Sequence, residues 1–313
     1  GADYVFYLPA DTPSNARRFL DIVHPEIAIF IKYEFWINLL SELRRRKVRS
    51  YIVSAIFRRN SVFFRPYGAM WRQALETFDT LFVQNVESKR LLSEIGFDNV
   101  VVAGDTRFDR VAQIAAAAQR VETIERFRGG GRLFVAGSTW GPDEEILLPL
   151  VNANPDVKFV IAPHEMDEGR IAHLMRNAKG GAVRYTQCDA ATRFDDVQVL
   201  VLDTMGMLSS VYGSATWAYV GGGFGVGIHN TLEAATFGLP IAFGPNYGKF
   251  KEARDMVSLG CAVSVRTAGE LAAWFAPLCD DEETLRRASR TAKDYTARNQ
   301  GATGIILRSI FNS

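Results

Sequence analysis

The sequence predicts an α/β protein built from two doubly wound parallel sheets that face a cleft. Short, continuous apolar runs such as Ile27–Ile31 and Trp217–Val220 alternate with helical stretches along the whole chain. Continuous apolar character is typical of parallel strands covered on both faces. A strand with one solvent-exposed face instead alternates apolar and polar residues. The 313 residues are enough for two domains of ordinary size, and Gly129-Gly130-Gly131 supplies a flexible point between two such series.

The first series begins with a strand and a well-marked helix. Thr12 and Pro13 suit the cap and first position of a helix that runs to about Val23, and His24-Pro25 ends it. Further strands are expected at Tyr4–Leu8, Ile27–Ile31, Tyr51–Ser54, Thr80–Val83 and Val100–Ala103, with helices at Phe35–Arg46, Phe63–Glu76, Glu87–Ile95 and in the alanine-rich stretch after Asp109.

The second series repeats the alternation. Strands are expected at Leu133–Ala136, Phe159–Ala162, Val197–Leu202, Trp217–Val220, Ile241–Phe243 and Ala262–Val265, and helices at Glu144–Asn152, Glu168–Ala178, Met205–Tyr212, Leu232–Phe237, Lys249–Ser258, Ala268–Ala276 and Glu282–Ala297. We therefore expect domains at 1–128 and 129–313, with the last helix packing back on the first domain. The first domain is expected to be incomplete, with its natural start upstream of Gly1.

Composition excludes several classes of function. A net charge of +1 argues against a general nucleic-acid binder. The three cysteines show no CxxC spacing and the four histidines are scattered, so neither a disulfide framework, a zinc site nor another metal site is expected. No apolar run reaches the length of a membrane span, and no signal peptide is visible.

One region is strongly basic. No acidic residue occurs between Arg44 and Arg72, and aromatic residues such as Phe57, Phe63 and Tyr67 interleave with the cations. Such a run is usually a solvated helix face, but a basic and aromatic surface also suits a membrane headgroup layer or a phosphorylated lipid. The candidate residues are Arg44, Arg45, Arg46, Lys47, Arg58, Arg59 and Arg65.

A glycine-rich stretch from Gly221 to Glu233 follows a predicted strand and precedes a predicted helix. Backbone N–H groups and the positive end of a helix dipole make such a turn suitable for an anion. The spacing matches neither GxGxxG nor a Walker loop. The structural alternative is a tight turn followed by a capped helix, with Asn230 as the cap and Glu233 completing a capping box. Five glycines and a histidine in one stretch favour the anion site over a purely structural turn. For Glu233 alone, helix capping and ligand contact are equally weighted.

Other polar residues follow predicted strands, where doubly wound sheets bind ligands. Singly, the hydroxyl and carboxylate residues are better explained as helix caps and His164 as a loop histidine, but together they indicate a nucleotide pocket. These residues are Ser138, Thr139, Pro163, His164, Asp203, Thr204, Met205 and Gly206. In the first half, Glu34 and Arg107 occupy comparable positions; a first-turn acid and a surface arginine are the alternatives.

Taken in order, these motifs resemble those of the Kdo transferases, GT-B glycosyltransferases that move 3-deoxy-D-manno-octulosonic acid (Kdo) from CMP-Kdo to a lipid A precursor. The DTMG and HNxLE elements are the specific ones. The matching stretches are Tyr33–Asn38, Gly104–Asp109, Gly137–Thr139, Ala162–His164, Asp203–Gly206, Gly221–Gly223, His229–Glu233, Gly244-Pro245 and Asn299–Ala302.

The resemblance implies a role for each element. Residues of the second domain would bind CMP: Ser138, Thr139, Pro163, His164, Met205, Gly206, Met207, Gly222, Gly223, Asn230, Thr231, Leu232 and Glu233. Glu34 and Arg107 would stabilise the transition state. The family's general base is a glutamate that we expect upstream of Gly1. Pro163, Arg107 and Thr231 depart from the family's arginine, lysine and proline, which leaves Arg170 and Lys249 as candidate cations for the donor phosphate.

The expected protein is therefore an inverting Kdo transferase without a cofactor. Its expected partners are CMP-Kdo, a lipid A precursor and an anionic membrane surface, at the cytoplasmic face of the bacterial inner membrane with peripheral attachment. Two alternatives are another GT-B activity, such as a UDP-sugar transferase or epimerase, and a CMP-binding fragment that lacks catalysis because the base is absent.

Overall fold

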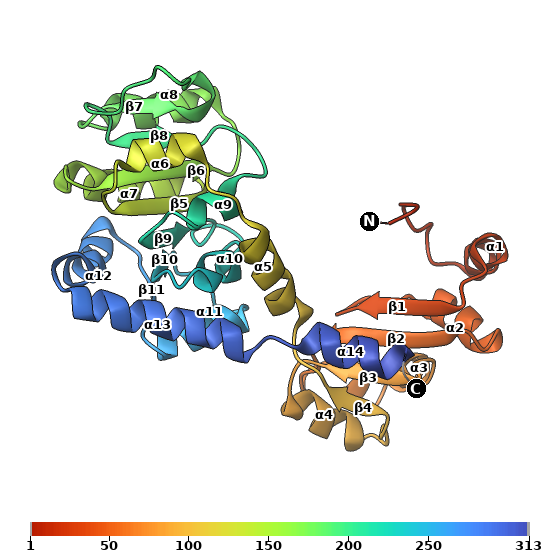
Figure 1. Ribbon diagram of the computed structural model, residues 1–313. Helices are drawn as coiled ribbons and strands as arrows, with labels where there is room; N and C mark the ends of the chain where they lie inside the picture. Colours follow the sequence, from red (N-terminus) through yellow and green to blue (C-terminus); the bar gives the residue numbers. More distant parts are fainter. Residues whose placement is uncertain (1, 312–313) are drawn as a thin grey trace. The chain divides into compact units, whose positions relative to one another are not determined.

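The computed structural model describes residues 2–311 and confirms the predicted class, an α/β protein with two parallel sheets (Figure 1). Contacts divide the chain into two compact units. Unit 1 is Gly1–Asp109 with Asn299–Ser313, and unit 2 is Arg110–Arg298. The predicted boundary at residue 129 thus differs from this division, because helix α6 (Glu122–Arg128) falls within unit 2.

The unit 1 sheet has four parallel strands in the order β1-β2-β3-β4. Its strands are β1 (Ile27–Ile31), β2 (Arg49–Ala55), β3 (Thr80–Val83) and β4 (Val100–Val102), and its helices are α1 (Pro13–Val23), α2 (Ile37–Arg45), α3 (Ala69–Leu75), α4 (Val86–Ser93), α5 (Thr106–Ala117, which continues into unit 2) and α14 (Ala302–Phe311). Leu20, Leu40 and Leu75 come from helices on one face and pack with Ile52 and Leu81 of the sheet.

Helix α14 covers the other face of this sheet (Figure 1). Ile306 and Ile310 pack there against Tyr51 and Phe82. The main-chain N–H groups of Gly301 and Thr303 donate to the Asp109 carboxylate, at 2.6 and 2.7 Å, which anchors the start of the helix. The chain therefore returns to unit 1 after it has completed unit 2.

The unit 2 sheet has seven parallel strands in the order β11-β10-β9-β5-β6-β8-β7. Its strands are β5 (Leu133–Thr139), β6 (Lys158–Pro163), β7 (Ala182–Arg184), β8 (Val199–Val201), β9 (Trp217–Val220), β10 (Ile241–Phe243) and β11 (Ala262–Ser264). Its further helices are α7 (Gly141–Ala153), α8 (Glu168–Asn177), α9 (Leu208–Tyr212), α10 (Thr231–Thr236), α11 (Lys251–Ser258), α12 (Ala268–Asp280) and α13 (Glu282–Arg298). Leu150, Ile171 and Phe275 bring α7, α8 and α12 onto one face, where Phe134 and Trp217 are fully buried.

Several predicted elements are corrected. Tyr4–Leu8 forms no strand, and Tyr7 is fully exposed. The helix predicted over Phe63–Glu76 is a 3-10 turn, Val62–Phe64, followed by α3. Met205–Met207 is a loop, because α9 begins only at Leu208. Helix α6, strand β7 and the bounds of α14 were not predicted.

Candidate functional site

The sequence motifs of unit 2 meet at the carboxyl ends of its central strands. β9, β5, β6 and β8 are four consecutive strands of the sheet, and the predicted residues follow their ends. The rings of His164 and His229 stack with centroids 4.4 Å apart, and Trp140 stacks on His164 at 4.8 Å. This arrangement joins the segments that follow β5, β6 and β9.

The indole Nε1 of Trp140 donates to Nε2 of His229 at 3.2 Å. His229 must therefore carry its proton on Nδ1 while this bond exists. Burial lowers the pKa of His229, and the neighbouring His164 lowers it further. The ring is thus held neutral as a hydrogen-bond acceptor at one wall of the site.

A pocket of about 450 Å³ opens beside this aromatic stack. Its lining is largely apolar, and Phe224 and the exposed Val226 form part of it. Asp143, Trp140, His164 and the backbone of the glycine-rich turn complete the lining. A concave apolar wall with few polar groups is the usual form of a small-molecule site.

The glycine-rich turn is fixed by a buried carboxylate that the sequence did not single out. Asp143 accepts from the N–H of Gly222 at 3.0 Å, from the Tyr219 hydroxyl at 2.7 Å and from the N–H of Trp140 at 2.9 Å. Burial raises the pKa of Asp143, against the opposing effect of these hydrogen bonds. At least one amide of the predicted anion-binding turn thus serves the structure itself.

Close backbone approach explains two of the glycines. A Cβ at Gly221 would lie 2.2 Å from the Ser138 carbonyl oxygen, and a Cβ at Gly223 would lie 2.6 Å from Cα of Gly244. The turn at Gly244 braces the first turn, because the N–H of Asn246 donates to the Gly223 carbonyl at 2.8 Å. Glycine at these positions is therefore a packing requirement.

Asn230 caps α10 as predicted, since its Oδ1 accepts from the N–H of Leu232 at 3.2 Å. Glu233 does not complete the expected capping box. Its carboxylate accepts from Nδ2 of Asn230 at 3.0 Å and from the Ser209 hydroxyl at 2.9 Å. Ser209 lies just after Met207, so this bond brings the Met205–Met207 loop beside the start of α10.

The capping interpretation fails for two other residues. The Thr139 hydroxyl donates to the Glu144 carboxylate at 2.9 Å. Asp203 accepts from the N–H and the hydroxyl of Thr186, at 2.9 and 2.6 Å. Thr139 thus connects the end of β5 to α7, and Asp203 connects the segment after β8 to the segment after β7. Ser138 has a φ of 54° in a bulge of β5, a strained conformation of the kind that clusters at functional sites.

The two candidate phosphate cations differ. Nη2 of Arg170 lies 2.8 Å from the Glu144 carboxylate, and its guanidinium lies 6.0 Å from the centre of the Trp140 ring. Lys249 is exposed, and neither residue lines the pocket beside Trp140. Arg170 is held at the carboxyl end of β5, where it donates to the Thr139 carbonyl at 3.3 Å and is partly neutralised by Glu144.

In unit 1, Glu34 follows β1 and is exposed. The indole Nε1 of Trp36 donates to it at 2.7 Å. The first turn of α2 is capped instead by Asp11, which accepts from the N–H groups of Asn38 and Leu39, both at 3.0 Å. Glu34 thus does not cap α2, and it lies at a largely apolar cavity of about 440 Å³.

Arg107 lies just inside α5 and is bound to a neighbouring carboxylate. Its Nε donates to Asp105 at 2.8 Å, and its N–H donates to the other carboxylate oxygen at 3.0 Å. Nζ of Lys32, which follows β1, lies 3.5 Å from the same carboxylate. Neither Asp105 nor Lys32 was singled out from the sequence, because the strand ends that bring them together are far apart in the chain.

The positive charge of the basic region in unit 1 is more fully paired with acidic residues than the sequence indicates. Arg44 pairs with Glu76 at 2.7 Å, and Arg59 pairs with Glu94 at 2.8 Å. Glu42 accepts from Arg45 and Arg46, whose hydrogen bonds lower the pKa of Glu42 to about 2. Acids that lie far away in the sequence or just before the run thus neutralise much of its charge. Within residues 2–311, the Arg58, Arg65 and Lys47 side chains form no ion pair.

Two of the interleaved aromatic residues belong to the core and not to the surface. Phe57 and Phe63 are buried, and their rings pack edge to face at 5.3 Å. Tyr67 remains exposed. The expectation of one continuous basic and aromatic surface is corrected accordingly.

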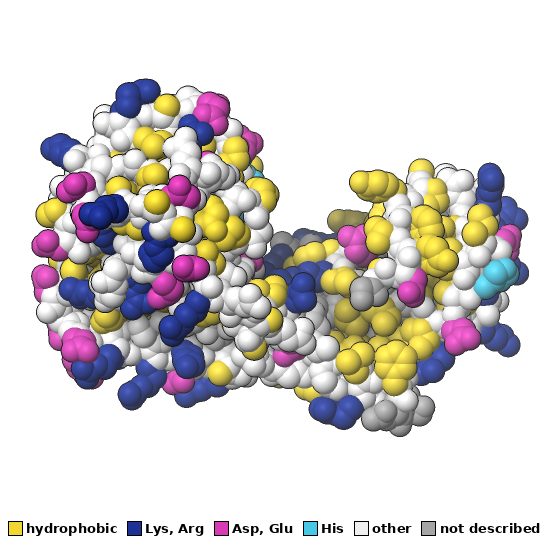
Figure 2. Space-filling view, turned by 45° about the horizontal axis from the view of Figure 1, so that its top comes forward, with side chains coloured by type: hydrophobic (Ala, Val, Ile, Leu, Met, Phe, Trp, Pro, Cys, Tyr) yellow, Lys and Arg dark blue, Asp and Glu magenta, His cyan; other side chains and the backbone are white. Residues whose placement is uncertain are grey.

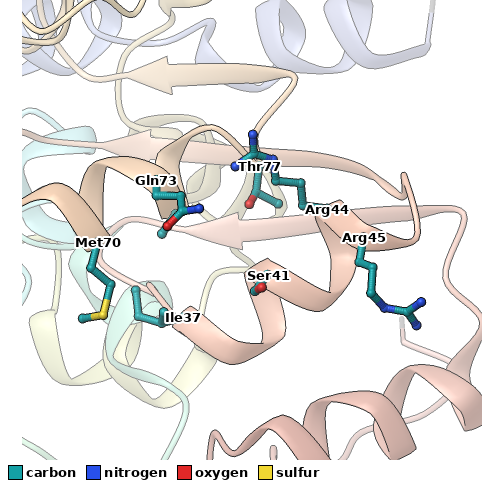
Figure 3. A pocket seen from close by; sticks show the side chains of 8 residues that line it. Ile37, Ser41, Arg44, Arg45, Met70, Gln73 and Thr77 are labelled. Atoms are coloured by element: carbon teal, nitrogen blue, oxygen red, sulfur yellow. The ribbon is translucent and has the colours of Figure 1, made fainter.

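A pocket of about 440 Å³ separates α2 from α3 within this region. Figure 3 shows Ile37 and Met70 at one end and Arg44 beside Thr77 at the other, while Arg45 extends away from them. Arg44 is neutralised by Glu76 and Arg45 by Glu42, so the pocket offers no excess of positive charge.

Hydrophobic side chains also gather on part of the unit 1 surface (right of Figure 2). Ile29 and Ile31 of the edge strand β1 are about half exposed. No helix within residues 2–311 is long and apolar enough to span a membrane. No group of three or more His, Cys, Asp or Glu side chains in this part of the chain is placed to hold a metal ion.

Comparison with known proteins agrees with the motifs. Residues 1–110 match the family model described as 3-deoxy-D-manno-octulosonic-acid transferase (kdotransferase). The 3-deoxy-D-manno-octulosonic acid transferase of Bordetella pertussis is 27% identical over 97% of this chain and 73% of its own length. That of Rickettsia felis is 23% identical over 85% of this chain, which spans 58% of that relative.

A solved UDP-GlcNAc 2-epimerase from Neisseria meningitidis superposes with a TM-score of 0.66 at 16% identity, over 96% of this chain and 80% of its own. That likeness concerns the fold alone and is consistent with the GT-B type. The sequence relatives, by contrast, match this chain in sequence over 85–97% of its length. The comparisons therefore confirm the resemblance of this chain, over most of its length, to the 3-deoxy-D-manno-octulosonic acid transferase family.

Proposed function

We propose that the protein transfers Kdo from CMP-Kdo to a lipid A precursor, with inversion at the anomeric carbon. The observation that carries the proposal is the convergence of the family's motifs at the carboxyl edge of the unit 2 sheet. Segments after β5, β6 and β9 line one pocket and meet in the Trp140–His164–His229 stack, and the Ser209–Glu233 bond holds the segment after β8 beside the start of α10. The Kdo transferase relatives support the reaction class.

Unit 2 would hold the CMP moiety. The exposed Met205 and the flat aromatic stack offer apolar surface to a base. Glu233, fixed by Ser209 and Asn230, offers a carboxylate to ribose hydroxyls. The remaining CMP contacts implied by the resemblance, from Ser138 and Thr139 to Gly222 and Gly223, lie at this same carboxyl edge.

Glu34 and Arg107 keep the catalytic roles that the resemblance implies. As CMP departs, negative charge develops on the phosphate and positive charge on the sugar ring, so a fixed cation and a fixed acid each lower the barrier. A general base would take the proton of the acceptor hydroxyl. The acceptor's phosphates and an anionic inner-membrane surface are the partners proposed for Arg58, Arg65 and Lys47.

The test is an assay of the full-length protein with CMP-Kdo and a lipid A precursor, in which CMP release and glycolipid are both measured. We expect glycolipid formation and stronger thermal protection by CMP than by UDP. Stronger protection by UDP, without transfer from CMP-Kdo, would instead favour a UDP-sugar enzyme of the same fold.

The variant Glu233→Gln separates ligand contact from helix structure. We expect weaker CMP protection with little change in the melting temperature of the unliganded protein, since the Gln oxygen can accept from Asn230 while its NH2 group donates to the Ser209 hydroxyl. A lower melting temperature with unchanged CMP affinity would assign Glu233 to helix structure alone.

A further inference from the structure

One wall of the pocket beside the aromatic stack is a loop with little structure of its own, Gly222–Gly227, which we call the pocket loop. Four of its six residues are glycine. Its side chains are those of Phe224 and Val226, and Val226 is 98% exposed. Because glycine has more backbone freedom than any other residue, such a loop would adopt many shapes if nothing held it. A restraint from outside the loop is therefore needed to keep a defined wall.

The segment Gly244–Phe250, which we call the bracing turn, supplies that restraint through Asn246. The N–H of Asn246 donates to the Gly223 carbonyl at 2.8 Å, and its side-chain Nδ2 donates to the Gly225 carbonyl at 2.7 Å. The Gly225 N–H in turn donates to the Gly222 carbonyl at 3.0 Å. A single residue of the bracing turn thus fixes the pocket loop at two points.

Two aromatic rings join the same segments. A Cβ at Gly244 would lie 3.0 Å from Cδ2 of Phe224, and a Cβ at Gly227 would lie 2.9 Å from Cε2 of Phe250. A ring of the pocket loop therefore packs on a glycine of the bracing turn, and a ring of the bracing turn packs on a glycine of the pocket loop. These reciprocal contacts hold the two segments together on either side of the Asn246 hydrogen bonds.

The bracing turn is poorly arranged to bind an anion itself. The N–H groups of Tyr247 and Phe250 donate to the carbonyls of Pro245 and Tyr247, at 3.0 and 2.9 Å. The N–H of Asn246 is already bound to the pocket loop, and the exposed Lys249 does not line the pocket. The contacts of this turn are therefore directed at the pocket loop.

We propose that the bracing turn preorganises the pocket loop for the sugar-nucleotide donor, with Asn246 as the positioning residue. The inference rests on the proposed function and adds Asn246 to the residues that serve it. When only a fraction of the molecules has the binding shape, the apparent affinity is reduced by that fraction. A loop held in one shape avoids this loss and the entropy cost of ordering on binding.

A different explanation is that Asn246 only stabilises the turn in which it lies. In that case, its removal would lower the melting temperature without weakening the binding of either substrate. The two explanations therefore separate in steady-state kinetics.

The experiment compares Asn246→Ala with Asn152→Ala in the full-length protein. Nδ2 of Asn152 also joins two segments, because it donates to the Asn177 carbonyl at 3.0 Å, but it lies near the end of α7 and the pocket lies at the start of that helix. We expect Asn246→Ala to raise the KM for CMP-Kdo about 3- to 10-fold, the loss of one ordinary hydrogen bond, and to leave the KM for the lipid acceptor unchanged. Asn152→Ala should change neither KM.

A second pair of variants tests preorganisation itself. Gly225 has no left-handed φ, and a Cβ there would meet only the Gly222 carbonyl oxygen at an ordinary 3.6 Å. Gly225→Ala therefore restricts the backbone of the pocket loop without strain. We expect Asn246→Ala to raise the KM for CMP-Kdo less in the Gly225→Ala background than in the wild type, and a double-mutant cycle measures this coupling. An equal rise in both backgrounds would overturn preorganisation as the role of Asn246.

Protection against thermal unfolding by CMP shows which part of the donor the pocket loop serves. Weaker protection in Asn246→Ala would assign the pocket loop to the nucleotide, and unchanged protection with a raised KM would assign it to the sugar acid. An unchanged KM for CMP-Kdo in Asn246→Ala would overturn the positioning role and leave the proposed function intact. A wild-type protein that neither transfers Kdo nor is protected by CMP would overturn both.

Discussion

The carboxyl edges of the two sheets share a backbone device and differ in charge. Each edge has a serine whose backbone adopts the left-handed conformation at a strand bulge. These residues are Ser54 in β2 and Ser138 in β5. Each also has an arginine on a buried carboxylate: Arg107 on Asp105, and Arg170 on Glu144.

The side chains around these features are unlike. In unit 1, two partly exposed cations surround one acid. In unit 2, Asp143 and Glu144 lie side by side in the chain and accept from neutral donors as well as from Arg170, beneath an aromatic stack. The two edges therefore share a backbone arrangement and differ in the side chains placed on it, and it is such side chains, not the fold, that determine function.

The largest expected effect concerns the two carboxylates. Asp143→Ala would leave the buried Tyr219 hydroxyl and the Gly222 N–H without their acceptor, and we expect the free energy of unfolding to fall by about 3–5 kcal/mol. Asp105→Ala should cost only about 1–2 kcal/mol, because Lys32 and Arg107 are partly exposed and can be rehydrated. Denaturant unfolding measures both, with the exposed Asp156→Ala as the control. An equal loss of stability in the two variants would contradict the contrast between the buried partners of Asp143 and the partly exposed partners of Asp105.

The next effect concerns backbone packing in unit 2. Gly221→Ala places a methyl group 2.2 Å from the Ser138 carbonyl oxygen, and overpacking of this kind costs about 1–3 kcal/mol. Gly225→Ala is the control, because its nearest neighbour, the Gly222 carbonyl oxygen, would lie at an ordinary 3.6 Å. Thermal unfolding should distinguish them. Equal stability of the two variants would show that the turn can move away from β5.

A smaller effect is expected from pH. Burial lowers the pKa of His229 below its ordinary value of 6.5, so in a window just below pH 6.5 the unfolded chain binds more protons than the folded protein. The stability that His229 contributes is complete above pH 6.5 and decreases as the pH falls through that window. His229→Gln should reduce this pH dependence, whereas the exposed His173→Gln should preserve it. A pH profile of the melting temperature that is the same in wild type and His229→Gln would contradict the burial argument.

Sequence reasoning succeeded where a local pattern carries the information. Continuous apolar runs predicted Ile27–Ile31 and Trp217–Val220 to the residue. The rule that ligand residues follow parallel strands predicted that segments after β5, β6 and β9 come together, as the His164–His229 stack shows. The cap at Asn230 was readable because its partner is two residues away.

The misses depend on contacts between distant parts of the chain. Asp11, which precedes α1 in the chain, caps α2. Asp105 follows β4 and binds Lys32, which follows β1, the strand at the other side of the sheet. Tyr4–Leu8 has the composition of a strand, but a strand needs a hydrogen-bonded neighbour, which composition does not reveal. Asp143 looks like an ordinary first-turn acid of α7, and only the fold shows that it holds the Gly222 turn.

The smallest effect concerns the surface of unit 1, where paired and unpaired arginines adjoin. Arg59 pairs with Glu94, which also binds Arg90, whereas Arg58 has no acidic partner within residues 2–311. An exposed ion pair contributes about 0–1 kcal/mol, so neither Arg58→Ala nor Arg59→Ala should change stability by more than that. On vesicles rich in anionic lipid, an uncompensated arginine near the surface contributes about 1 kcal/mol. Arg58→Ala should therefore weaken flotation more than Arg59→Ala, and high salt should remove the difference. Equal flotation of both variants at low salt would mean that this face of unit 1 does not meet the anionic headgroups.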